Sequence, residues 1–138
     1  MDTARKLSSV LGISALLLAG CNNKVNDCNT LIKSVNDAQA KVKEPHQDDP
    51  AGLEKFAVAL DTAATEVNKA EVKLPELQKF RGDYASTLTN MAKTFREAAE
   101  ASKAGDAEKL QAAAKSFPEA GEKIDKATAD INAFCSGK

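Results

Sequence analysis

Apolar residues recur every three or four positions along most of the chain. This spacing gathers them on one face of an α-helix, because a helix completes one turn in 3.6 residues. Four stretches carry the pattern, and each predicts an amphipathic helix: residues 27–43, residues 50–73, residues 75–104 and the segment that follows Asp106.

Prolines separate the first three stretches. Pro45 ends the first, because the residue before a proline is disfavoured in the helical conformation. Asp49-Pro50 has the pattern of an N-cap followed by proline at the first helical position. Pro75 ends the second stretch in the same way and opens the third. The chain therefore predicts short connections between long helices.

The last stretch begins after a glycine and contains a proline. Gly105 is predicted to take the left-handed conformation that ends a helix, and Asp106 to cap the next one. Pro118 removes a backbone donor, but the apolar phase is the same on both sides of it, which predicts one kinked helix. We predict an all-α fold, an antiparallel up-down-up-down four-helix bundle with a kinked last helix.

The N-terminal residues follow a different pattern. Arg5 and Lys6 precede a mostly apolar run over residues 7–19, and the polar Asn22 follows soon after it. A basic start before a short apolar run is typical of a secretory signal peptide. The run is shorter than the roughly 20 residues that a membrane-spanning helix needs.

The run ends in Leu18-Ala19-Gly20-Cys21, which resembles the lipobox of bacterial lipoproteins. The resemblance covers residues 1–21. It implies removal of a signal peptide (residues 1–20), a diacylglyceryl group on the Cys21 sulfur and acylation of the new amino terminus. Asn22, where an Asp would imply retention at the inner membrane, favours the outer membrane. The alternative is an ordinary signal peptide that is cleaved near Ala19-Gly20.

Removal of residues 1–20 leaves 118 of the 138 residues, enough for one domain. We expect residues 21–26 to hold the lipidated cysteine and a short polar spacer, and residues 27–138 to form the bundle. The membrane is then the first partner, through the lipid on Cys21.

Cys28 and Cys135 remain near the two ends of this mature chain. An exported protein occupies an oxidising space, so a Cys28–Cys135 disulfide is predicted. The up-down-up-down topology brings the same two residues to one end of the bundle. The alternatives are two buried free thiols, or a metal pair that would need further ligands.

The charges are balanced, with 19 basic and 20 acidic side chains, and give no reason to expect nucleic acid as a partner. Aromatic residues make up 4% of the chain, which suits closely packed helices better than a sheet.

The chain offers little for catalysis or for cofactors. Its single histidine, His46, has no nucleophile–base arrangement around it, and no phosphate-binding glycine loop, haem motif or di-iron motif is present. We therefore expect no enzyme and no cofactor. A metal candidate is the loop with Glu44, His46, Asp48 and Asp49. The alternative is a solvated loop that caps the second helix.

These observations predict a non-enzymatic envelope lipoprotein that acts as a structural or protein-interaction module for an unidentified envelope protein. Its end distant from the membrane would be acidic (Glu44, Asp48, Asp49, Asp106 and Glu108) and its membrane end basic (Lys24, Lys69, Lys73 and Lys138). The alternative is a small-ligand or metal-binding envelope protein, which would use the acidic loop 44–49 or a core cavity lined by Phe80, Phe95 and Phe117.

Overall fold

The computed structural model describes residues 14–42 and 49–137, with side chains in the first helix from Asn23 onward. Over these residues the chain is helical, without strands, and the four helices are α1 (Ser14–Lys41), α2 (Pro50–Asn68), α3 (Pro75–Ala104) and α4 (Ala107–Ser136). The predicted all-helical fold of four helices is confirmed.

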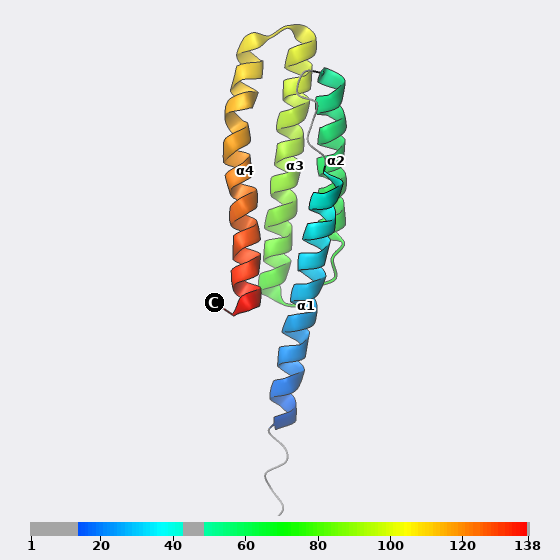
Figure 1. The fold of residues 1–138 in the computed structure, drawn as a ribbon, viewed down its shortest axis with the longest axis vertical. Helices are drawn as coiled ribbons and strands as arrows, with labels where there is room; N and C mark the ends of the chain where they lie inside the picture. The colour runs from blue at the N-terminus through cyan, green and yellow to red at the C-terminus, as the bar shows by residue number, and fades with distance from the viewer. Residues whose placement is uncertain (1–13, 43–48, 138) are drawn as a thin grey trace, which may run out of the picture.

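The third helix is the centre of the structure. It packs closely against α2 and α4, which lie on either side of it, whereas α1 packs less closely on the other three (Figure 1). Nine residues of α3 are buried, against two of α4. The largest side chains that are almost fully enclosed belong to a single core: Tyr84, Leu31, Leu60, Leu77, Ile131 and Val67.

Several buried positions in α2 and α3 are alanines, for example Ala57, Ala63, Ala92 and Ala98, each at most 1% exposed. Small side chains let two helix backbones approach closely, which a ring or a branched chain at these positions would prevent. The Ala-rich composition therefore determines how tightly α2 and α3 pack.

The first helix is longer than predicted. It spans Ser14–Lys41, so residues 21–26, predicted as a spacer before a helix that begins near Asp27, are helical. The physical reason is that the Leu- and Ala-rich residues 15–19 favour a helix, and no proline interrupts the chain between them and Pro45. In Figure 1, α1 extends beyond the other helices at the end where α4 finishes.

The second helix is shorter than predicted. It ends at Asn68 instead of near Lys73, and residues 69–74 form a connection whose Ala70 and Val72 side chains are buried. Leu74 lies in the extended region, as expected before Pro75. The apolar stripe continues through this connection because its side chains still enter the core, not because its backbone is helical.

The remaining boundaries agree with the sequence. Asp49 caps α2, Pro75 opens α3, and Gly105 ends α3 with a positive φ of 67°. Asp106 caps α4, and α4 continues through Pro118 as one helix.

Candidate functional site

We call the region around Cys28 and Cys135 the disulfide end. The two cysteines are bonded, with Cα atoms 5.7 Å apart, which confirms the predicted disulfide. Beside the bond, the Lys24 ammonium lies 4.4 Å from the centre of the Phe134 ring. The bond thus fastens the first helix to the last helix, 107 residues away along the chain.

Asp27 makes a second attachment at this end. Its carboxylate is 7% exposed and accepts hydrogen bonds from the backbone N–H groups of Lys73 (2.6 Å) and Leu74 (2.9 Å). Burial of a carboxylate is costly unless such donors compensate for the lost water. Sequence reasoning missed this role, although the position of Asp27 directly before Cys28, at the edge of the apolar stripe, was a signal for it.

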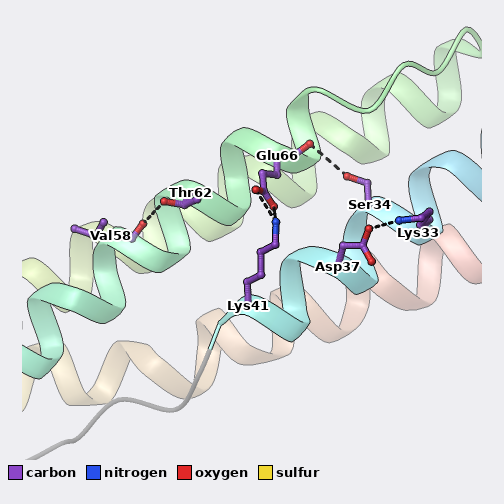
Figure 2. A network of polar contacts seen from close by, with 7 residues as sticks. All are labelled: Lys33, Ser34, Asp37, Lys41, Val58, Thr62 and Glu66. Carbon is purple, nitrogen blue, oxygen red and sulfur yellow. Dashed lines mark hydrogen bonds and ion pairs between the residues drawn. The ribbon is translucent and has the colours of Figure 1, made fainter.

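Polar contacts connect α1 to α2 further along. The Ser34 hydroxyl donates to the Glu66 carbonyl oxygen (3.3 Å), and the Lys41 ammonium donates to both Glu66 carboxylate oxygens (2.7 Å each) (Figure 2). Lys33 pairs with Asp37 within α1. Lys41 is exposed, so solvent weakens its ion pair with Glu66, and these contacts orient α1 more than they hold it.

Tyr84 connects α1 to the core. Its side chain is fully buried, and its hydroxyl accepts a hydrogen bond of 2.9 Å from the Gln39 amide. Burial raises the pKa of the Tyr84 hydroxyl, which stays protonated and polar inside the bundle. The hydroxyl lies inside the bundle, and its partner Gln39 is exposed at the bundle surface.

The opposite end of the bundle carries capping carboxylates. Asp49 accepts from the Ala51 N–H (2.9 Å) and Asp106 from the Lys109 N–H (3.0 Å). The Lys109 N–H is the main reason that the pKa of Asp106 lies below its usual range. Two of the predicted acidic residues at this end therefore already stabilise helix starts.

A pair of exposed side chains joins α2 to α3 at this same end. Glu54 and Lys103 form a salt bridge of 2.8 Å, whose hydrogen bond lowers the pKa of Glu54 and raises that of Lys103. The pair places the beginning of α2 beside the end of α3.

One of the four predicted metal ligands, Asp49, lies within the described residues. Glu44, His46 and Asp48 lie outside the described residues, and Asp49 is the α2 cap. Within residues 14–42 and 49–137, no group of three His, Cys, Asp or Glu side chains is close enough to hold a metal ion. Cys21 falls within the range of α1, but its side chain lies outside what the structure describes.

The phenylalanines form two separate clusters. Phe95 stacks on Phe117 (ring centres 4.4 Å apart) and meets Phe56 edge-on (4.6 Å), whereas Phe80 packs against Phe134 (5.7 Å). Phe80 and Phe95 are 15 residues apart in one helix, which separates them by about 22 Å. The rings of Phe80, Phe95 and Phe117 therefore do not line one common cavity.

Among the described residues, no helix combines the length and the apolar character that crossing a membrane requires. Comparisons with family models, with curated proteins and with solved structures give no match.

Proposed function

We propose that this protein is a lipid-anchored module of a bacterial cell envelope that binds another envelope protein and has no enzymatic activity. Asn22 after the lipobox cysteine favours the outer membrane over the inner membrane as its location. The observation that carries the proposal is the continuity of α1 from the lipobox-like segment into the bundle. A lipid on Cys21 would be joined to the folded domain by helix instead of by a flexible spacer.

This continuity determines the distance between membrane and bundle. Cys21 and Cys28 are seven residues apart, which is about 10 Å along a helix at 1.5 Å per residue. Two or more acyl chains on Cys21 would hold the chain firmly, since each buried CH2 contributes roughly 0.8 kcal/mol. The disulfide end would then lie close to the bilayer, with the long axis of the domain directed away from it.

The proposal takes the helices to run in alternating directions, with a kink at Pro118 in α4. Two observations support the alternation: the Cys28–Cys135 bond between the first and last helices, and the Glu54–Lys103 pair between the start of α2 and the end of α3. With this topology the α3–α4 turn at Gly105 faces away from the membrane.

The partner would meet the bundle at that distant end. Here Glu97, Glu100 and Asp106, together with Lys109, line a hollow between α3 and α4 whose floor includes Ala101 and Ala113. Glu97 pairs with Lys93 and Asp106 with Lys109, so Glu100 is the carboxylate that a basic segment of an envelope protein would meet.

The anchor is tested by replacing Cys21 with serine and comparing the membrane and soluble fractions. Wild-type protein is expected in the membrane fraction, with the intact mass of a chain that starts at Cys21 and carries acyl groups. The Cys21→Ser variant is expected to lack the acyl groups and to leave the membrane fraction. The double variant Cys28→Ser, Cys135→Ser is the control, because it removes the disulfide and leaves the lipobox unchanged. An unacylated wild-type mass would contradict the proposal.

The partner is sought by photo-cross-linking from two exposed positions on α4. Glu108 lies next to the α3–α4 turn and Asn132 near the disulfide. A discrete adduct from Glu108 that is absent from Asn132 supports the distant end as the contact surface. Equal adducts from both positions, or one from Asn132 alone, would overturn this orientation.

Ligand or metal binding is the competing function. The separation of the two phenylalanine clusters argues against a shared apolar cavity, as described above. A thermal shift with divalent cations that disappears in the variant Asp48→Ala, Asp49→Ala would instead favour the metal-binding alternative.

A further inference from the structure

The disulfide lies at the base of a solvent-open hollow between α1 and α4. Val25, Asn29 and Ile32 of α1 line one side, and Asn132, Ala133 and Ser136 of α4 line the other, with both cysteines between them. Cys28 is 4% exposed, whereas Cys135 is partly exposed. Cys135 is the more exposed of the two residues, so we take its sulfur as the one that a reagent in the hollow attacks.

The helix that this bond fastens is the one that packs least closely. α2 and α4 each pack extensively on α3, and α1 contacts all three more sparsely. Apart from the disulfide, the polar attachments of α1 include the Lys24 ammonium over the Phe134 ring and the buried carboxylate of Asp27. The Gln39–Tyr84 hydrogen bond and the Glu66 contacts shown in Figure 2 complete this set. Its buried apolar residues, Cys28, Leu31, Val35 and Ala38, make one narrow stripe.

We propose that Cys28–Cys135 is a thiol–disulfide exchange site, and that its reduction releases α1 from a body formed by α2, α3 and α4. The reductant is a dithiol, small or protein-borne, that reaches the bond through the hollow. The disulfide is thus a reversible cross-link that holds helix α1 instead of a permanent one.

The exchange balances in two steps. A thiolate of the dithiol attacks the Cys135 sulfur and forms a mixed disulfide, while the bond to Cys28 breaks and Cys28 leaves as a thiolate that takes a proton from water. The second thiol of the reductant then attacks, as a thiolate, the reductant sulfur that is bonded to Cys135. Cys135 leaves as a thiolate, which is also protonated. Two electrons pass from the dithiol, which ends oxidised, to the cysteine pair.

The release does not depend on the anchor proposed above. With that anchor, however, α1 would remain at the membrane while α2, α3 and α4 moved away from it, held by the connection between α1 and α2. The body would expose the core surface that Leu31 and Val35 cover in the oxidised state. Reduction would therefore change both the reach of the domain and the surface that it offers.

The test adds dithiothreitol to the folded full chain without denaturant and traps free thiols by alkylation. Hydrogen exchange is followed by mass spectrometry on the same samples. We expect both cysteines to be alkylated while amides of residues 77–101 stay protected, and exchange over residues 23–41 to rise. If the cysteines are alkylated no faster than the amides of residues 77–101 exchange, reduction requires global unfolding and the proposal is overturned. Unchanged protection of α1 after reduction would also overturn it.

A matched pair of variants tests the role of the hollow. Ala133→Phe places a ring over the bond, whereas Ala129→Phe adds the same ring at another exposed position of α4 that does not line the hollow. We expect Ala133→Phe to slow native-state reduction about tenfold, because exchange requires access to the sulfur, and Ala129→Phe to leave it unchanged. Equal rates in the two variants would show that the hollow is not the route.

Discussion

Helices α1 and α3 are both amphipathic and both about 30 residues long, yet they are held in different ways. α3 is buried at nine positions and packs between two neighbours. The described part of α1 is buried along one stripe and depends on a covalent bond, a buried carboxylate and a few polar contacts. Similar hydrophobic patterns therefore led to a central element in one case and a fastened one in the other.

The difference shows what an amphipathic pattern specifies. It determines which face of a helix is buried, but not how many neighbours cover that face. α3 packs against α2 and α4, and alanines such as Ala92 and Ala98 allow close approach. α1 is held by a few specific attachments instead of by a large buried area. Single substitutions at those attachments should therefore affect α1 and α3 differently.

The largest expected effect follows from removing the disulfide. The double variant Cys28→Ser, Cys135→Ser lacks the cross-link that closes a loop of about 100 residues. In the chain-entropy model this lowers the free energy of unfolding by at most about 4.7 kcal/mol. We expect two stages in chemical denaturation, with hydrogen exchange of α1 rising at lower denaturant than that of α3. One transition shared by all four helices would show that α1 and α3 are held alike.

The next effect compares two leucines that are equally buried. Leu31 in α1 and Leu77 in α3 are both fully enclosed, so replacement of either by alanine should cost about 2–5 kcal/mol of unfolding free energy. In the oxidised protein, where α1 is packed, we expect Leu31→Ala to raise exchange mainly in α1 and Leu77→Ala to raise it in α2, α3 and α4 together. The same exchange pattern in both variants would remove the distinction between the two regions.

A smaller effect is expected at Asp27. Asp27→Ala leaves the N–H groups of Lys73 and Leu74 without their acceptor, which should cost about 1–3 kcal/mol in denaturant unfolding. Asp27→Asn keeps an acceptor oxygen of similar position and is the matched control. Equal losses in the two variants would assign the effect to packing or charge instead of to these hydrogen bonds.

The smallest effect concerns the Asp106 cap, far from α1. The pKa of Asp106 is lowered in the folded protein, so its stabilising contribution is present above the unfolded pKa, near 3.8, and is lost as pH falls through the folded value. We expect Asp106→Asn to remove this part of the acid sensitivity while keeping a capping side chain. Thermal unfolding between pH 5 and pH 2, a window of about three units around these values, measures the difference. Identical pH profiles for the wild type and Asp106→Asn would contradict the assignment.

The sequence by itself predicted much of the helical framework. Proline and glycine act through local backbone geometry, so Pro75, Gly105 and the Asp49-Pro50 pair located helix ends that the structure confirms. The spacing of apolar residues predicted helices with one buried face, although Leu110 on the apolar stripe of α4 is 38% exposed. The predicted topology placed Cys28 beside Cys135, and the two are bonded. These features depend on residues close together in the chain or on one simple packing scheme.

Only the tertiary structure determined how the helices depend on one another. The end of α2 at Asn68 is coupled to Asp27, 41 residues earlier, which accepts hydrogen bonds from the connection that follows. The burial of Tyr84 with Gln39, and the sparse packing of α1 beside the close packing of α3, also arise between distant segments. A periodic pattern is a local property and contains no information about which distant backbone group will need an acceptor, or how many neighbours will cover a helix.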